Sequence, residues 1–515
     1  MSPPRNTHTA TTANVGADTA GDDAHYLALK ARDARFDGRF FVGVTSTGIY
    51  CRPVCKVRAP KRENCRFFAL PAQAEHAGFR PCMRCRPELA PATAPTALGT
   101  HWSTQDASSI LALQAARLLD SPEPWNVGAT SIVQLAQRLG ISERHLRRIF
   151  ETQWGVSPLQ YLQTRRLLTA KRLLTDTALP VATVAHLSGY ASVRRFNAVF
   201  LAHYRLQPLA LRKAIAPRTL SPQSQGLVLR ASYRQPYDAD AMLAFFETRC
   251  VRGIEWVDAA QRRIARTVRI EHSGHVHSGW VQAHFLGTAD AVEFHISESL
   301  TPVLPLVLAR LHAWLDLDTD PAPIAQQLGP QFANLEGRRV PGTLDGFELA
   351  VRAILGQQIT VAAARTLADR LVAHCGALLP TPFAALTHTF PSAERLAAMP
   401  ASELGALGIV RQRQQTIGTL AQAVMDGRIA LHASADIAST MAALQALPGI
   451  GAWTANYIAM RALRWPDAFV AGDVALQKAL GVRDAKHPAQ AAEEASQAWK
   501  PWRSYAVVRA WSLQK

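Results

Sequence analysis

A cluster of cysteines is the first feature of the sequence whose residue type and spacing could do chemistry. Of the seven cysteines, five lie between Cys51 and Cys85, and four form two close pairs, Cys51-x3-Cys55 and Cys82-x2-Cys85, separated by 26 residues. Two such pairs can supply four thiolates to one tetrahedral Zn²⁺, either as a reactive centre or as a purely structural zinc knuckle. Cys65 has no close partner, so we expect it to be a bystander. The odd total and the confinement to one segment argue against a disulfide framework.

A second candidate site is a glycine-rich turn followed by a single carboxylate. The turn reads Leu447-Pro-Gly449-Ile-Gly451 between two helical stretches, and Asp473 follows Gly472 and precedes VALQKAL. Glycines in such a turn let backbone N–H groups face a phosphate at the N-terminus of the next helix. Alone, the turn fits any tight connection between packed helices, and the aspartate fits a helix N-cap. Together, at this separation, they are a far more specific signal.

The hydrophobic pattern divides the chain into the parts that must position these residues. Apolar spacings of three and four residues predict helices, whereas segments such as RRIARTVRIEH alternate as strands do. We predict a disordered tail at 1–23, a cysteine module at 24–90, a helical module at 106–215, a β-rich module at 227–300 and a second helical module at 301–515, with linkers at 90–100 and 217–226. The expected fold class is a multidomain chain, α+β in part and mainly α.

Composition bounds the function. The chain has 515 residues, and at about 150 residues per domain it should hold three or four domains. With 48% hydrophobic and 18% charged residues it should be globular. We expect neither a membrane span nor a secretion signal, because no apolar run approaches ~18 residues and the N-terminus lacks an apolar core. The net charge of +17 favours a polyanionic partner, most often nucleic acid.

Two units in the first helical module, at 131–158 and 179–208, have the pattern of a helix-turn-helix. Each consists of a short apolar helix, a glycine turn, a serine N-cap and an arginine-rich helix. The turns and caps are Gly140 with Ser142 in the first unit and Gly189 with Ser192 in the second. A plain helical bundle with solvated charged faces is the alternative interpretation.

Each unit ends in a G-V-S-P or R-L-Q-P turn, and a long helix joins the two, so this module resembles the DNA-binding domain of AraC-type regulators. The resemblance implies recognition helices near 142–150 and 192–200 that enter successive major grooves, about 34 Å apart. The candidate DNA contacts are Arg144, Arg147, Arg148, Arg194 and Arg195. The sequence does not separate base contacts from phosphate contacts.

The cysteine module resembles the N-terminal domain of the Ada alkylation-response proteins. The resemblance rests on FDGRFFVGVTSTGIYCRPVCKVRAPKRENCRFF and AGFRPCMRCRPE. It implies that Cys51 accepts a methyl group from a DNA methylphosphotriester, and that Cys51, Cys55, Cys82 and Cys85 bind the zinc. The Pro-Cys-His-Arg motif of the methyltransferase domain that often follows in Ada proteins does not occur, so we expect no direct repair of O6-methylguanine.

The C-terminal half resembles the helix-hairpin-helix DNA glycosylases and, more closely, 3-methyladenine DNA glycosylase II of the AlkA type. The resemblance rests on LQALPGIGAWTANYIAMRALRWPDAFVAGDVALQKAL, GFELAVRAILGQQITVAAA and WKPWRSYAVVRAW, and covers most of 227–515. It implies that Asp473 is the catalytic carboxylate, which stabilises the cation formed at C1′ and orients or deprotonates the attacking water. It also implies that Leu447, Gly449 and Gly451 of the hairpin bind DNA.

Three aromatic residues, Trp453, Tyr457 and Trp511, match the family's pocket for the electron-poor alkylated base. For Tyr457, core packing is the alternative. Bifunctional relatives carry a Schiff-base lysine where this chain has Trp453, so we expect hydrolysis without strand cleavage. Where AlkA inserts a leucine wedge into the duplex, this chain has Gln357-Gln358, so either Gln358 or another residue takes that role.

The leading hypothesis is therefore a fused alkylation-damage protein that senses methylphosphotriesters, reads promoter DNA and excises alkylated purines such as 3-methyladenine. Its expected cofactor is Zn²⁺, its partners are double-stranded DNA and RNA polymerase, and its location is the cytoplasm, at the nucleoid. One alternative is a methylation-responsive regulator whose glycosylase half only binds DNA. Another is a glycosylase whose N-terminal domains only lengthen its residence on DNA.

Overall fold

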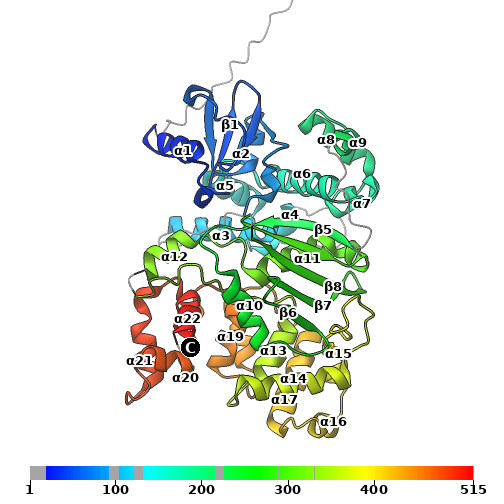
Figure 1. Cartoon of the computed structure of the whole chain (residues 1–515), viewed down its shortest axis with the longest axis vertical. Coiled ribbons are helices and arrows are strands. Elements are labelled where there is room, and N and C mark those ends of the chain that lie inside the picture. The colour runs from blue at the N-terminus through cyan, green and yellow to red at the C-terminus, as the bar shows by residue number, and fades with distance from the viewer. Residues whose placement is uncertain are drawn as a thin grey trace, which may run out of the picture.

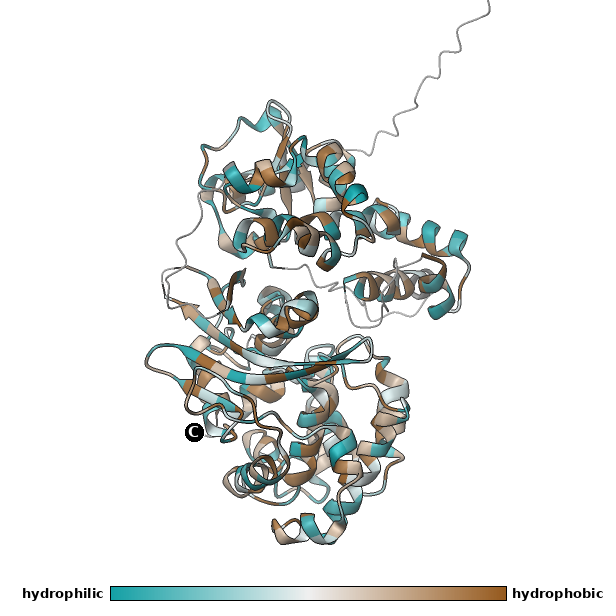
Figure 2. Cartoon of the chain, turned by 90° about the vertical axis from the view of Figure 1, so that its right-hand side faces the viewer, coloured by the Kyte–Doolittle hydropathy of each residue, from teal (hydrophilic) through white to brown (hydrophobic). Residues whose placement is uncertain are grey.

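The computed structural model describes residues 19–91, 104–120, 132–214, 226–287, 289–329 and 331–513. The cysteine module and most of the first helical module lie side by side at one end of the long axis, the larger sheet lies in the middle and the second helical module extends to the other end (Figure 1). The apolar faces of the helices turn inward in both halves (Figure 2). No helix in the described ranges is long and apolar enough to cross a membrane.

The cysteine module is a small sheet flanked by helices. Its elements are α1 (Thr19–Ala31), η1 (Ala34–Phe36), β1 (Phe41–Val44), β2 (Ile49–Cys51), η2 (Arg62–Asn64), β3 (Cys65–Phe68), α2 (Pro71–His76), β4 (Arg80–Pro81) and η3 (Pro87–Leu89), with strand order β3-β1-β2-β4. Helix α1 begins inside the segment predicted to be disordered, because Ala28 and Leu29 bury its apolar face in the module's core. The rest of that tail, and both linkers except residues 90, 91 and 226, lie outside the described residues.

The first helical module contains both predicted helix-turn-helix units. Its helices are α3 (Thr104–Asp120), α4 (Ile132–Arg138), α5 (Glu143–Trp154), α6 (Pro158–Asp176), α7 (Val181–Leu187), α8 (Val193–Tyr204) and α9 (Pro208–Ala214). Ser142 caps α5 by accepting from His145 N, and Ser192 caps α8 by accepting from Arg195 N. The turns before them place Gly140 at φ +67° and Gly189 at φ +80°, where glycine carries little strain. The helix α6 joins the two units.

The middle module is an antiparallel sheet with one face packed on helices. Its strands are β5 (Leu227–Ser232), β6 (Glu255–Asp258), β7 (Arg263–His272), β8 (His275–Leu286) and β9 (Ala291–Ile296), in the order β5-β9-β8-β7-β6, and α10 (Ala239–Thr248) lies between β5 and β6 in sequence. Inward-facing residues such as Ile264, Val281 and Phe294 are buried, as the period-2 pattern requires.

The second helical module surrounds two apolar cores. Its elements are η4 (Glu298–Val303), α11 (Leu304–Leu315), α12 (Pro321–Leu328), α13 (Gly346–Leu355), α14 (Val361–Cys375), α15 (Ala393–Ala397), α16 (Ala401–Ala406), α17 (Arg411–Met425), α18 (Ile437–Gln445), α19 (Ala452–Arg461), α20 (Val474–Ala479), α21 (Pro488–Ala495), η5 (Gln497–Trp499) and α22 (Arg503–Ser512). Helices α13, α14 and α17 share one core, and α20 and α22 share the other. Helix α19 contributes to both, so its side chains meet α22 as well as α13.

Candidate functional site

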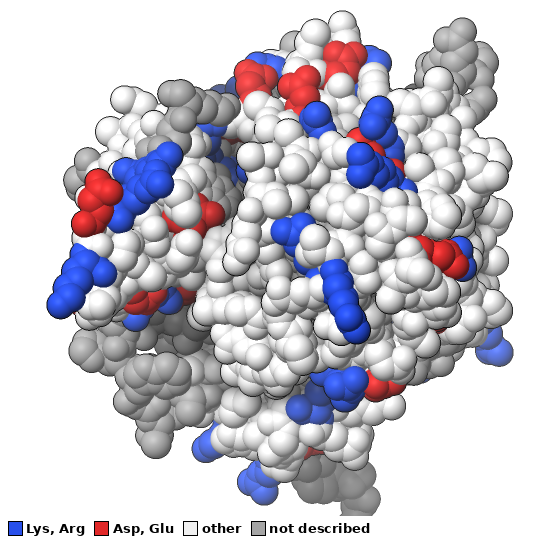
Figure 3. Space-filling view, turned by 90° about the horizontal axis from the view of Figure 1, so that it is seen from below, with Lys and Arg blue, Asp and Glu red and all other residues white. Residues whose placement is uncertain are grey.

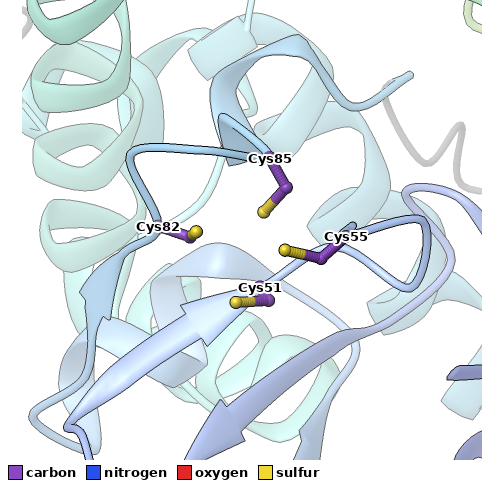
Figure 4. Close-up of side chains that lie close together, drawn as sticks. All are labelled: Cys51, Cys55, Cys82 and Cys85. Carbon is purple, nitrogen blue, oxygen red and sulfur yellow. The ribbon is translucent and has the colours of Figure 1, made fainter. Parts of the chain in front are cut away.

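The four predicted metal ligands lie together in the structure. Their Sγ atoms are all within 4.8 Å of one another, and the side chains point toward a common centre (Figure 4). A tetrahedral site with Zn–S bonds of about 2.3 Å places its sulfurs about 3.8 Å apart, so the cluster fits one Zn²⁺. Strand pairing brings the two pairs together: β2 and β4 run parallel with Tyr50 opposite Pro81, and Cys82 N donates to Tyr50 O (2.9 Å).

The four sulfurs differ in their hydrogen bonds. The backbone N–H of Arg52 donates to Cys85 Sγ (3.3 Å), and that of Arg84 donates to Cys82 Sγ (3.4 Å). Cys55 also has a backbone hydrogen bond, from Val57, whereas none to Cys51 Sγ is found within the described residues. Hydrogen bonds to a thiolate stabilise its charge and lower its reactivity, which leaves Cys51 better suited to act as a nucleophile than Cys82 or Cys85. Cys65 lies outside the cluster, and its Sγ donates to Lys61 O (3.3 Å).

The five candidate arginines are all exposed, on the two helices that follow the turns. Arg144, Arg147 and Arg148 lie on α5, and Arg194 and Arg195 lie in the first turn of α8. Arg148 Nη2 contacts His145 Nδ1 (3.1 Å), and Arg147 lines a surface hollow of about 310 Å³ beside Pro158. The arrangement therefore offers two exposed basic helices, one in each unit.

The predicted hairpin connects α18 to α19. Gly449 has φ +87°, and a Cβ there would lie 2.1 Å from Thr416 Oγ1, so the turn requires glycine. Gly451 is the N-cap of α19 and provides no side-chain cap, which leaves the first N–H groups of that helix available to an anion. Leu447 is buried in the core beside α18, so its side chain faces away from solvent.

Asp473 is the N-cap of α20, as the structural interpretation predicted, and it also lies between two indole rings. Its Oδ1 accepts from Leu476 N (2.8 Å) and from Trp511 Nε1 (3.0 Å). Its Oδ2 accepts from Trp453 Nε1 (3.2 Å). The cap and the indoles together hold the half-buried carboxylate in one orientation.

The predicted aromatic residues Trp453, Tyr457 and Trp511 are half-buried around this carboxylate. Trp453 and Tyr457 stack, with centroids 5.2 Å apart and planes 9° from parallel. Arg461 Nη1 donates to the Tyr457 hydroxyl (2.6 Å). Burial alone would raise the pKa of Tyr457, but the charges of Arg461 and Arg249 outweigh it and the pKa lies below its ordinary value.

The sequence analysis missed a wall of this site that comes from the middle module. Phe245 of α10 and its C-cap residue Arg249 line a cavity of about 180 Å³ that adjoins the site through Trp511, and the Arg249 guanidinium lies 3.9 Å from the Phe245 ring centroid. The signal was the pair Phe245-Phe246, because neighbours on a helix point about 100° apart. Phe246 packs in the core against Trp314, so Phe245 faces the cavity.

Gln358 lies at an exposed tip between α13 and α14, with φ +56°. The tip is tied to the hairpin, because Gln357 Nε2 donates to Gly449 O (2.9 Å) and to Thr454 Oγ1 (3.0 Å), and Arg413 donates to Gln357 O. A left-handed backbone at a residue other than glycine is strained and is found most often at functional positions. The surface at this end of the molecule is mostly uncharged, with separate basic side chains spread over it (Figure 3).

Four family models match the chain in the order of its modules. The metal binding domain of Ada matches residues 24–88, a helix-turn-helix domain matches 135–214, the AlkA N-terminal domain matches 228–345, and the HhH-GPD superfamily of base excision DNA repair proteins matches 351–504. The Ada match and the cysteine cluster inside it assign Zn²⁺ as the metal cofactor.

Curated relatives match the whole chain and its halves. A probable bifunctional transcriptional activator/DNA repair enzyme AlkA from Mycobacterium tuberculosis is 37% identical over 498 residues, which is 95% of each chain. DNA-3-methyladenine glycosylase 2 of Escherichia coli is 34% identical and matches 54% of this chain and 95% of its own length. The bifunctional transcriptional activator/DNA repair enzyme Ada of Escherichia coli is 37% identical and matches 30% of this chain and 39% of its own length.

Proposed function

Because this chain belongs to the family of bifunctional transcriptional activator/DNA repair enzymes that join an Ada-type sensor to an AlkA-type glycosylase, we propose that it carries out two reactions on alkylated DNA. Its C-terminal half, 227–515, excises alkylated purines such as 3-methyladenine by hydrolysing the N-glycosidic bond. Its N-terminal half takes a methyl group from a methylphosphotriester at 24–90 and reads promoter DNA at 106–215.

The excision proposal rests on the carboxylate of Asp473, which two indole N–H groups and a helix N-terminus hold beside an aromatic cavity. Breaking the bond between C1′ and the base leaves positive charge on the deoxyribose, which a fixed carboxylate stabilises. The same carboxylate can orient or deprotonate the attacking water. The freed electron pair goes to the base, and water adds to C1′ and gives up a proton.

The base pocket and the hairpin supply binding. An alkylated base extruded from the duplex would stack on the rings of Trp453, Tyr457, Trp511 and Phe245. The free N–H groups at the start of α19, next to Gly449 and Gly451, would hold a backbone phosphate, and Gln358 would fill the gap left in the duplex. A tryptophan at position 453 cannot form a Schiff base, so the enzyme is monofunctional.

The methyl-acceptor proposal rests on Cys51, which within the described residues receives no backbone hydrogen bond of the kind found at Cys82 and Cys85. Zn²⁺ bound by Cys51, Cys55, Cys82 and Cys85 would keep the cysteines as thiolates at neutral pH. The Cys51 sulfur attacks the methyl carbon, the C–O bond breaks, and its electron pair stays on the phosphate as a diester anion. The sulfur becomes a thioether and the site loses one negative charge, which raises its affinity for DNA.

That change in affinity would turn the damage signal into transcription control. Arg144, Arg147 and Arg148 on α5, with Arg194 and Arg195 on α8, would bind promoter DNA, and activation would need RNA polymerase as a partner. Such a protein would work in the cytoplasm, at the nucleoid.

Base release from methylated duplex DNA tests the excision proposal. We expect free 3-methyladenine with the wild type and none with Asp473→Asn, and uncleaved abasic strands until heat or alkali is applied. The variant should still bind the DNA, because asparagine also caps α20. Excision by Asp473→Asn would refute the catalytic assignment. No release from either protein would favour the alternative function, a methylation-responsive regulator whose glycosylase half only binds DNA.

A further inference from the structure

A fully buried arginine joins the cysteine module to the glycosylase half. Arg234 follows β5, and its guanidinium is 0% exposed. Nε donates to Asp37 O (2.8 Å) and Nη2 to Pro91 O (3.1 Å), both in the cysteine module, while Nη1 donates to Asp318 O (2.9 Å) in the segment after α11. Gly38 permits this approach, since a Cβ there would lie 2.1 Å from Pro91 O. The guanidinium of Arg234, which is shielded from water, thus donates hydrogen bonds to both parts of the chain.

We call these contacts of Arg234 with Asp37, Pro91 and Asp318 the seam between the cysteine module and the glycosylase half. A second arginine connects this seam to the metal ligands. Arg52 follows the methyl acceptor in sequence and is 7% exposed. Its guanidinium holds the Asp37 carboxylate with Nε (2.8 Å) and Nη2, and Nη1 donates to Cys85 O (3.1 Å). Nη2 also donates to Ser232 Oγ (3.2 Å), on strand β5 of the glycosylase half. The Asp37 carboxylate is therefore held by Arg52, which also donates to the metal ligand Cys85, while the backbone carbonyl of Asp37 accepts from Arg234.

The helix-turn-helix module closes the seam on its other side. From α6, Lys171 Nζ donates to Cys82 O (3.3 Å), and Arg172 Nη2 donates to Arg230 O (2.7 Å) on β5. Leu173 belongs to the same buried apolar cluster as Leu229 of β5. Polar and apolar contacts thus make β5 a strand shared by all three modules.

Such a seam is stable only when it is complete. A buried guanidinium costs several kcal/mol to desolvate, about as much as its hydrogen bonds return, and losing one partner leaves an uncompensated charge. Without metal, the segments around Cys51 and Cys85 lose the cross-link that fixes them. Arg52 and Asp37 are then no longer held in one position. The disturbance then reaches Arg234 and Ser232 through the hydrogen bonds described above.

We propose that the cysteine module and the glycosylase half form one thermodynamic unit, joined by Arg52, Asp37 and Arg234, so that zinc binding at the cysteine cluster stabilises strand β5 and the 316–320 segment. By linkage, whatever stabilises those glycosylase segments also strengthens zinc retention. This inference rests on the zinc site, and not on methyl transfer or excision.

Hydrogen exchange of the full chain, zinc-loaded and after chelator treatment, tests the coupling. In the wild type we expect zinc removal to speed exchange in 226–232 and 316–320 by about tenfold, and restored zinc to reverse it. Arg234→Met should show the faster exchange even with zinc bound. The control is Arg252→Met, which removes an exposed arginine that pairs with Asp369 and precedes β6, the edge strand opposite β5, and it should behave as the wild type does.

If Arg234→Met does not fold, Ser232→Ala decides, because it removes only the bond to Arg52 and should weaken the zinc response of 226–232. The proposal would be overturned if hydrogen exchange in 226–232 and 316–320 of the wild type did not change when zinc is removed. An Arg252→Met variant that matches Arg234→Met would also overturn it, because the effect would then not belong to the seam. Neither readout uses excision or methyl uptake, so the proposed function stands or falls separately.

Discussion

The cysteine cluster and the Asp473 site hold their reactive groups in different ways. The four sulfurs come from 35 consecutive positions, 51–85, and two short strands bring them together. Asp473 receives hydrogen bonds from Trp453 and Trp511, and Trp511 also lines a cavity with Phe245, more than two hundred residues earlier in the chain. The first site is local and the second is assembled by the packing of α10, α19, α20 and α22.

The difference shows in what each site tolerates. A metal cross-links a local cluster directly, so its geometry depends on few other residues. A carboxylate held by indoles depends on side chains whose positions are set by two separate apolar cores, which pack on either side of α19. We therefore expect single substitutions to abolish the first activity outright or not at all, and to reduce the second by degrees.

Cys51→Ala should separate the two sites completely. Methyl uptake from a methylphosphotriester should disappear, because the nucleophilic sulfur is gone. Base excision by the same preparation should stay within about twofold of the wild type, because three cysteines remain to hold the zinc and neither β5 nor 316–320 contributes a residue to the Asp473 site. Transfer of labelled methyl to protein, followed by peptide mapping, measures the loss. Cys65→Ala is the control and should keep full uptake, and uptake by the Cys51→Ala protein would assign the reaction to another thiol.

Glu75→Gln should change the pH dependence of the N-terminal half alone. Glu75 accepts from Tyr50 (3.1 Å) and Thr164 (2.8 Å), with Lys171 and His203 also facing it, and burial raises its pKa to about 7. A carboxyl whose pKa is raised on folding favours the folded state most when protonated. The contribution of Glu75 to the stability of the folded state should therefore fall as pH rises from about 4.5 to about 7 and stay level above that.

Glutamine imitates the protonated acid, so the variant should be more stable than the wild type at pH 8 by about 3 kcal/mol and equal to it at pH 4.5. Thermal unfolding at the two pH values measures the difference in stability. Hydrogen exchange in α2 and α6 shows whether the difference belongs to this region. A variant with the same pH dependence as the wild type would contradict the assignment to Glu75.

Trp511→Phe should weaken excision by about 10- to 100-fold. The variant keeps an aromatic ring in the cavity but removes the N–H bond to Asp473 Oδ1, a charge-assisted bond worth about 1.5–3 kcal/mol. Single-turnover excision rates measure the loss, with Trp502→Phe, at the opposite end of α22, as the control. Equal rates for the two variants would mean that the indole N–H does not position the carboxylate.

Gln358→Ala should have the smallest effect, a loss of about two- to tenfold in affinity for duplex DNA containing an abasic-site analogue. The backbone tip should remain, because Gln357 and Arg413 hold it. Fluorescence anisotropy with intact and abasic duplexes measures the change. An equal loss on both duplexes would argue against a role for Gln358 in filling the gap.

Much of the architecture could be predicted from the sequence, because local patterns of residue type and spacing specify its helices and turns. The serine caps and glycine turns of the two helix-turn-helix units are confirmed, as is the fold class. The boundary at α1 differed, because the helix begins at Thr19 inside the predicted tail and Arg62 pairs with its Asp22 and Asp23. Leu447 belonged to the quoted hairpin motif, yet its side chain is buried in the core.

By itself the sequence determined the chemistry: four cysteines at zinc spacing, and an aspartate that follows a glycine hairpin. These are short-range features, and their meaning survives without coordinates. Only the tertiary structure decided that Asp473 serves as N-cap and indole-bound carboxylate at once, that Phe245 faces the cavity, and that Arg52 and Arg234 meet at Asp37. Those contacts join positions far apart in the chain, and buried side chains choose their partners by packing and desolvation, which no local spacing encodes.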